Sequence, residues 1–473
     1  PPSPVAYAFP HIQWDPLGSL RLTAQETALL RMAETNPIEY TLADSRDASM
    51  YARVLLKLLA EASAAGAGTG EVSKITETCT DEEAMQALDA DPLGVVTHYA
   101  LTKLYEIIAS LSTGASGVTV GAVFYVGKDG VLVDQWKALL RILNKGGKGD
   151  AYTQKGGALC LALILLTACP SQRLSAPTTD KDGQAIKPRP ISYASAMEPL
   201  EALTSWIVSQ LKNATGTNVG LCIPALTTLM GCQETRILFC SSGGIKYLSR
   251  QLRIGSKGAK SSAVAEAKKK IGQASVQQLY ELSFCLWTLT YELNAQYTVR
   301  ADFSKDGLSV AALVDLVSIA PREKVVRVAL ASLRNLATCT AEQNPPPAGS
   351  PPLDGPAFLS EMIACGLMKA IDLLKDRQFT DPDIMDDVDV LYKLLVENYK
   401  EMSRWEVYKN EVESGHLQWG STHTEAFFKE NARMMEGSDG DFHLVKVLIA
   451  LLTNKDEDVA AIACYDIGEF CRH

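Results

Sequence analysis

Three stretches of the sequence repeat one pattern, and this repetition limits the folds that the chain can adopt. Each stretch has a glycine, a short amphipathic helix with Leu or Ile every three to four residues, a polar turn and a longer helix. The glycines are Gly244, Gly307 and Gly366, which lie 63 and 59 residues apart. One such unit cannot bury its apolar face alone, whereas stacked units share a continuous core. The pattern therefore predicts an α-solenoid.

The repeat spacing exceeds the roughly 40–47 residues of armadillo and HEAT units, and non-periodic insertions explain the excess. The insertions between the repeats lie at about 254–274 and 340–356. Segments at about 64–95, 112–131 and 170–195 are also compositionally biased. No convincing alternation of apolar and polar residues occurs, so we predict essentially no β-sheet. The predicted fold class is all-α, an armadillo/HEAT-like α-solenoid with a smaller C-terminal helical domain.

The charge balance argues against a nucleic-acid partner. The 473 residues carry a net charge of −10, whereas phosphate binding needs clustered Lys and Arg. The densest basic run, Lys257–Lys270, lies in one of the insertions, and we interpret it as a solvated helix. With 47% hydrophobic residues, the chain can bury a large core.

Cysteine usage and hydropathy indicate a cytosolic protein that does not enter a membrane. The 11 cysteines are odd in number, lack a CxxC pair and mostly lie in apolar helical runs. This is typical of small buried side chains in a reducing compartment. The most apolar run, Ala158–Ala168, is shorter than the roughly 20 residues of a membrane-spanning helix. We expect it to be the inner helix of a repeat, with no direct membrane insertion.

The search for chemistry predicts no catalytic, cofactor-binding or metal site. His416 and His423 lie seven residues apart without a zinc-binding motif, and we expect turn and helix-end roles for them. The glycine-rich Lys145–Gly157 lacks the phosphate-loop pattern and reads as a flexible inter-helix loop. The acidic Asp381–Val390 lacks the glycine of a calcium-binding loop. It is typical of a charged first helical turn.

A solenoid without catalytic groups is expected to bind proteins. Peptide-reading armadillo proteins line their groove with Trp and Asn four residues apart. Here Asn335 has Ala331 four residues before it, and Trp287 is followed by Tyr291. The ladder is missing, which argues against an importin-like peptide carrier and leaves broader protein–protein docking.

Several segments carry a resemblance to a known family. From Leu279 to His473 the sequence resembles the H subunit of the vacuolar-type proton-pumping ATPase (V-ATPase), and weaker similarity extends through the N-terminal half. The matching segments are Phe284–Ala295, Glu323–Leu336, Val407–Met435 and Asp458–His473. The most specific signature is the order Trp419, His423, Phe427, Phe428 and Asn431.

The resemblance implies a non-catalytic regulatory subunit of the pump. An N-terminal armadillo/HEAT domain, expected at 1–397, would bind the peripheral stalk, which is made of the E and G subunits. A C-terminal domain, expected at 402–473, would lie between the catalytic-sector subunits and the cytosolic domain of the a subunit. Such a protein works at the cytoplasmic face of vacuolar or other endomembranes, permits coupling in the intact pump and inhibits hydrolysis by the detached soluble sector. The alternative is a free-standing armadillo-repeat adaptor or scaffold.

The resemblance also points to particular residues in the C-terminal domain. A loop of the family reaches toward the central rotor when the soluble sector is detached. The matching segment is Thr453–Asp458, with Lys455, Asp456 and Glu457 as candidate rotor-facing inhibitory residues. We place the interdomain hinge near Glu397–Ser403.

Two further expectations concern the same domain. We expect Trp419, Phe427 and Phe428 to anchor its core. Family members continue past the helix that ends here at His473, so we expect a last repeat to be missing from this sequence.

Overall fold

The computed structural model describes the chain with gaps. The described residues are 21–42, 45–64, 92–112, 120–125, 136–144, 150–173, 193–212, 216–253, 276–304, 308–320, 322–401, 404–437 and 440–473. These residues form helices, turns and coil, and no strand occurs among them. The predicted all-α fold is confirmed. They belong to two compact units, residues 1–238 and 239–473, which are described separately.

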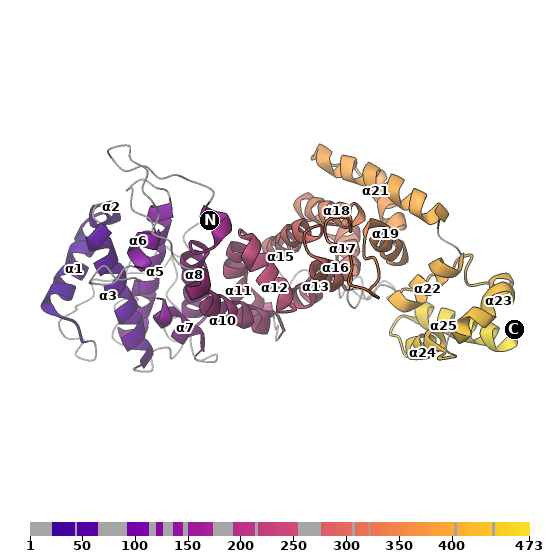
Figure 1. Ribbon diagram of the computed structural model, residues 1–473, viewed down its shortest axis with the longest axis horizontal. Helices are drawn as coiled ribbons and strands as arrows, with labels where there is room; N and C mark the ends of the chain where they lie inside the picture. Colours follow the sequence, from indigo (N-terminus) through magenta and orange to yellow (C-terminus); the bar gives the residue numbers. More distant parts are fainter. Residues whose placement is uncertain are drawn as a thin grey trace. The chain divides into compact units, whose positions relative to one another are not determined.

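In the first unit, long helices pack one against the next (Figure 1). The helices are α1 (Ala24–Thr35), α2 (Ile38–Thr41), α3 (Ser45–Ala64), α5 (Pro92–Ser112), α6 (Val120–Phe124), α7 (Lys137–Asn144), α8 (Ala151–Leu166), α9 (Pro170–Arg173), α10 (Tyr193–Lys212) and α11 (Gly216–Leu229). Helix α3 packs on α5, α5 on α8 and α8 on α11. This succession of neighbours is the stacking that the repeat pattern predicts.

Local sequence signals position several helix starts in this unit. Thr23 is the N-cap of α1 and forms the reciprocal capping box with Glu26, as its sequence indicates. Asp150 caps α8 by accepting a hydrogen bond from the Thr153 amide at 2.9 Å. Helix α8 therefore begins inside Lys145–Gly157, so the prediction of a loop throughout that segment is wrong.

The apolar run Ala158–Ala168 occupies the buried part of α8 and the turn after it, as predicted. No described helix combines the length and the apolar character that crossing a lipid bilayer requires.

In the second unit, sets of three helices repeat. Helix α12 (Gln233–Ser241) leads into this unit, and the others before residue 402 are α13 (Gly244–Leu252), α15 (Val276–Leu289), α16 (Tyr297–Ser304), α17 (Leu308–Ile319), α18 (Glu323–Ala337), α19 (Gly355–Ala364), α20 (Leu367–Lys375) and α21 (Pro382–Glu401). The second helices stack in the order α13, α17, α20, and the third in the order α15, α18, α21. Three helices per repeat, stacked in register, define an α-solenoid of the armadillo type.

The repeat glycines act at the turn before the second helix. Gly366 has a φ of 76° and forms the N-cap of α20, a left-handed conformation that suits glycine. In the first repeat this role belongs to Gly243, with a φ of 70°. Gly244 is used for close packing instead, since an added Cβ would lie 2.4 Å from the Phe239 ring. Gly307 lies outside the described residues.

The expected insertions fall mostly outside the described residues, including the basic run Lys257–Lys270. Two short helices lie in these segments, because α6 falls within 112–131 and α9 begins the segment 170–195. The segment Thr340–Asp354 is described and forms coil without a helix, as expected. Helix α21 continues to Glu401 and α22 begins at Arg404. Within the predicted interdomain hinge, only residues 402–403 lie between the two helices, and these are not described.

Candidate functional site

The C-terminal helices, residues 404–473, surround a core of their own. They are α22 (Arg404–Ser414), α23 (Glu425–Asn431), α24 (His443–Leu451) and α25 (Glu457–Arg472), at the yellow end of Figure 1. Their buried core consists of Tyr408, Val412, Leu417, Phe427, Phe428, Met435, Leu444, Leu448, Val459, Ile462 and Ala463. Burial of this apolar surface supplies the main driving force for packing these helices together.

Aromatic rings form the centre of this core. The Tyr408 ring lies 4.9 Å from the Phe427 ring and 5.5 Å from the Phe428 ring, measured between centroids. Both phenylalanines are fully buried, as predicted. The prediction for Trp419 is wrong, because its side chain is 56% exposed. Leu417 is buried two residues earlier, so the segment after α22 uses the leucine as its core residue.

A polar network crosses this apolar core. His423 Nδ1 lies 2.9 Å from Asp466 Oδ2, and His423 Nε2 lies 3.3 Å from Glu411 Oε1. The Tyr408 hydroxyl donates to Asp466 Oδ2 at 3.3 Å. Burial alone would lower the pKa of His423, but hydrogen bonds and charge from Asp466 and Glu411 outweigh it and raise that pKa to about 9. The imidazole is therefore protonated at neutral pH and ties α22 and α25 together.

His423 lies in the turn before α23, as expected, and its backbone N–H donates to the Gly420 carbonyl at 3.3 Å. The sequence reasoning missed the buried ion pairs of its side chain. Its main partner, Asp466, lies 43 residues later in the chain. A histidine and an aspartate at that separation carry no local signal. His416 does lie in the turn after α22, with its backbone N–H donating to Ser414 Oγ at 3.2 Å.

The candidate inhibitory loop joins α24 to α25. Turns close it on the α24 side, where the amide of Asn454 donates to the Leu451 carbonyl at 2.9 Å. Asp456 is buried and serves as the N-cap of α25, accepting from the Asp458 amide at 2.9 Å. Lys455 and Glu457, on either side of it, are exposed. The three predicted residues therefore divide into one structural cap and two accessible charges.

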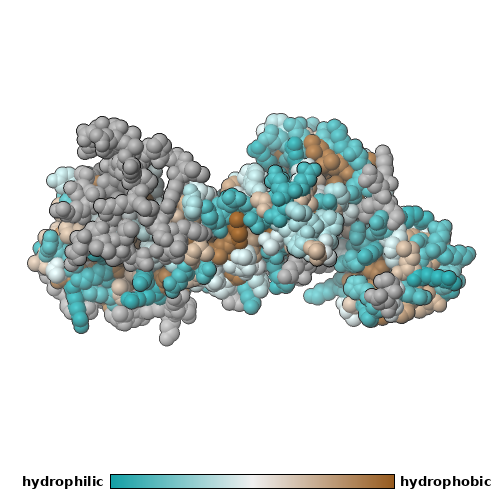
Figure 2. All heavy atoms as spheres, in the orientation of Figure 1, coloured by the Kyte–Doolittle hydropathy of each residue, from teal (hydrophilic) through white to brown (hydrophobic). Residues whose placement is uncertain are grey.

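Exposed apolar side chains lie next to this loop in sequence. Ile449 is 54% exposed and Leu452 is 40% exposed. The C-terminal helices also expose Trp419, Met434 and Phe442, and their surface in the view of Figure 2 mixes hydrophilic with apolar atoms. Apolar side chains flanked by accessible charges are a composition suited to contact with another protein.

A second candidate surface is a groove of about 770 Å³ lined by α15, α18 and α21. Tyr280, Phe284 and Trp287 of α15 form a continuous aromatic row, which Tyr291 extends from the short 3-10 helix that follows. Arg327 of α18 pairs with Asp381, just before α21, and with Asp383 in the first turn of α21. Arg334 of α18 pairs with Asp387 one turn further along α21.

The residues considered for peptide reading are partly engaged inside the fold. Asn335 donates its amide hydrogen to Thr290 Oγ1 at 2.8 Å, rather than facing an open groove. The Trp–Asn ladder of peptide-binding armadillo proteins is therefore replaced here by the aromatic row of α15.

The fold defines this chain as a helical-repeat protein of the armadillo type. Family models for the H subunit of the V-ATPase match residues 95–395, for the N-terminal domain, and 401–473, for the C-terminal domain. The chain belongs to the V-ATPase H-subunit family.

Individual relatives agree with this assignment. A probable H subunit of the V-type proton ATPase of rice is 29% identical over 72% of this chain and 66% of its own length. The corresponding H subunit of Dictyostelium discoideum is 28% identical over 80% of this chain and 70% of its own. The H subunit of Drosophila melanogaster is 34% identical over 42% of this chain and 40% of its own length. The chain thus spans about two thirds or less of several of these relatives.

Solved structures add little. A designed armadillo repeat protein superposes with a TM-score of 0.26 at 15% identity, over 70% of this chain and 98% of its own. An engineered protein gives a TM-score of 0.31 at 16% identity, over 72% of this chain and 98% of its own. At such scores the superpositions carry no weight, and the fold assignment rests on the helix packing described above.

Proposed function

We propose that the chain is a non-catalytic, regulatory subunit of the vacuolar-type proton-pumping ATPase. The observation that carries this proposal is the match of two H-subunit family models, in order, to residues 95–395 and 401–473. The protein would act at the cytoplasmic face of the membranes that hold the pump, attached through other subunits.

Within the pump, the helical repeats would bind the peripheral stalk made of the E and G subunits. Helix stacking supports this role because a solenoid offers a long, continuous surface to an elongated partner. The groove of α15, α18 and α21, with its aromatic row and rim of charged residues, is a surface suited to such a contact. The C-terminal helices would lie between the catalytic sector and the cytosolic domain of the a subunit.

The proposed domain division places the stalk-binding part at 1–397 and the regulatory part at 402–473. Its support is the end of α21 at Glu401, the start of α22 at Arg404 and the separate core of the C-terminal helices. The two family models, 95–395 and 401–473, meet within a few residues of this break.

The loop between α24 and α25 would act as the brake on the central rotor in the detached sector. Lys455 and Glu457 are the accessible charges for such a contact, and Asp456 would hold the loop in shape as the cap of α25. The exposed Ile449 and Leu452 add apolar area beside these charges.

Replacing Lys455 and Glu457 by alanine tests the brake without removing the Asp456 cap. Detached soluble sector lacking its own H subunit would be rebuilt with the parent chain or with the double variant, and its ATP hydrolysis measured. We expect the variant to release the inhibition while proton pumping by the intact enzyme changes little. The matched control is the pair Glu425→Ala and Lys429→Ala, two exposed charges on α23, which should leave inhibition intact. Equal suppression by the parent and by the Lys455/Glu457 variant would rule out this loop as the brake.

Association with the pump itself is tested by affinity purification of the tagged chain from its native cells. We expect recovery of the catalytic-sector and stalk subunits in fixed ratio. Recovery as a monomer without them would favour a free-standing armadillo adaptor and would contradict the proposal.

A further inference from the structure

Two buried cysteines occupy equivalent positions in successive repeats of the first unit. Cys169 follows the last residue of α8 by three positions, and Cys232 follows the last residue of α11 by three. Each closes the same turn, with its amide donating to the last helical residue: Leu166 at 3.0 Å and Leu229 at 3.4 Å. The two cysteines are 63 residues apart, which matches the spacing of Gly244 and Gly307. Because α8 packs on α11, the stacking brings both turns together.

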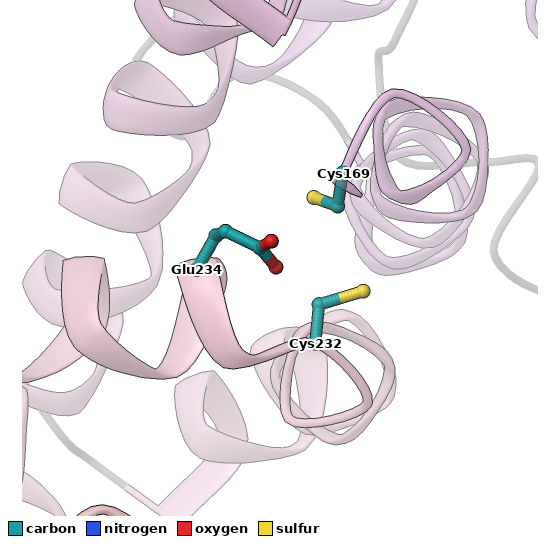
Figure 3. A group of neighbouring side chains, drawn as sticks. All are labelled: Cys169, Cys232 and Glu234. Carbon is teal, nitrogen blue, oxygen red and sulfur yellow. The ribbon is translucent and has the colours of Figure 1, made fainter. Parts of the chain in front are cut away.

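A carboxylate completes the cluster. The two sulfur atoms and a carboxylate oxygen of Glu234 all lie within 4.8 Å of one another. In Figure 3 the Cys169 sulfur and the Glu234 carboxylate point toward each other, with the Cys232 side chain beside them. Both cysteines are fully buried, whereas Glu234 is half-buried and gives the cluster an open side.

The glutamate is held in place and charged. Its oxygens accept hydrogen bonds from the amide and the hydroxyl of Ser171, at 3.0 and 2.6 Å. Burial alone would raise the pKa of Glu234, but the hydrogen bonds from Ser171 and the charge of Arg236 outweigh it and lower that pKa. Hydrogen bonds of this kind orient a metal-ligating carboxylate.

This donor set selects among metal ions. Two thiolates and one carboxylate suit a borderline-soft cation, whereas calcium and magnesium prefer oxygen ligands only. Zinc accepts sulfur at about 2.3 Å and carboxylate oxygen at about 2.0–2.2 Å in a tetrahedron. Contraction of the cluster by about 1 Å would satisfy these distances. Three protein ligands leave the fourth position to water on the open side.

We propose that Cys169, Cys232 and Glu234 form a zinc site that clips two successive helical repeats together. The site lies where the turn after α8 meets the turn after α11. Binding releases the two thiol protons, and the metal adds a direct link between turns that already meet by packing and through the Ser171–Glu234 hydrogen bonds. The site is independent of the role proposed for the C-terminal loop.

The test uses the full chain, reduced and stripped of metal with a chelator. Zinc chloride is added, unbound metal is removed, and bound zinc is measured by mass spectrometry. Cobalt(II) is titrated in parallel, because thiolate ligation gives a charge-transfer absorption band and a tetrahedral visible spectrum. Cys464 and Cys471, which are exposed on α25, are replaced by serine throughout to remove surface thiols.

We expect one zinc per chain and a thiolate–cobalt band. Cys169→Ser and Cys232→Ser should each abolish the band, and Glu234→Gln should weaken metal binding at least about tenfold. The control is Cys222→Ser, a buried cysteine on α11 outside the cluster, which should keep both signals. Circular dichroism shows whether each variant remains helical.

Failure to bind zinc, or a cobalt spectrum without the thiolate band in the unmutated cluster, would overturn the proposal whether or not the variants fold. The proposal would also be overturned if the protein from reducing cells contains a Cys169–Cys232 disulfide and the reduced protein then takes up no zinc.

Discussion

The aromatic core of the C-terminal helices offers a direct comparison between two residues of one sequence signature. Phe428 is fully buried, with its ring edge against Tyr408 and Phe427, whereas Trp419 is 56% exposed. Replacing a buried Phe by Ala removes the transfer free energy of the ring and leaves a cavity, at a cost of about 3–5 kcal/mol. Replacing the exposed Trp should cost less than about 1 kcal/mol.

Hydrogen exchange of the full chain measures this difference locally, because a single unfolding free energy is poorly defined for a chain of several cooperative parts. A loss of 3–5 kcal/mol corresponds to about a 100- to 4,000-fold fall in amide protection. We expect this fall in peptides from α23 and α25 of the Phe428→Ala variant. The Trp419→Ala variant should lose less than about fivefold.

Helices of the first unit serve as the internal reference, since neither change should alter their exchange. A fall of less than about threefold for Phe428→Ala would contradict its assignment to the core. Equal losses of amide protection in both variants would show that the exposed fraction of the side chain does not determine the cost of substitution at these two positions.

Three further predictions concern titration and backbone conformation. Because the folded-state pKa of His423 is raised from 6.5 to about 9, its contribution to stability is complete below about pH 6.5 and is lost as pH rises through about 9. The melting temperature measured across this pH range should fall accordingly. If the melting temperature of a His423→Gln variant depends on pH in the same way, His423 is not the group responsible. Burial raises the pKa of Glu361 from 4.5 to about 8, so this carboxyl destabilises the fold increasingly as pH rises from about 4.5 through about 8. Glu361→Gln should therefore raise the melting temperature above about pH 8 and change it little in acid; no gain at alkaline pH would refute the reasoning. Gly366→Ala places alanine at a φ of 76° and should cost about 1–2 kcal/mol. Gly468→Ala, on a helical glycine with open space around it, should instead stabilise by about 0.5–1 kcal/mol, and denaturant unfolding that shows equal effects would contradict this account.

The local part of this structure could be predicted well from the sequence. Helix periodicity, the Thr23–Glu26 capping box and the acidic first turn of α21 each depend on residues three or four positions apart. The repeat spacing then predicts stacking, since each unit has one apolar face to cover. One such local signal was overlooked at the start of α8. Asp150 is the N-cap of this helix, so the helix begins within the segment that was predicted to be a loop.

The resemblance carried by the Trp419–Asn431 signature led to the H-subunit family, which the family models confirm. The signature did not separate structural from exposed positions. Its phenylalanines are buried and its tryptophan is not, because the turn after α22 places Leu417 in the core. Likewise Asp456 matched a candidate contact residue by position, yet its side chain is used as a helix cap.

Only the tertiary structure decided which distant polar side chains meet. His423 pairs with Asp466 across 43 residues, and Cys169 meets Cys232 and Glu234 through the packing of α8 on α11. The sequence by itself determined where helices form, because backbone hydrogen bonds, caps and apolar periodicity act over one or two turns. The angle and register at which those helices stack depend on the shapes of whole surfaces, so the clusters that stacking creates appear only in three dimensions.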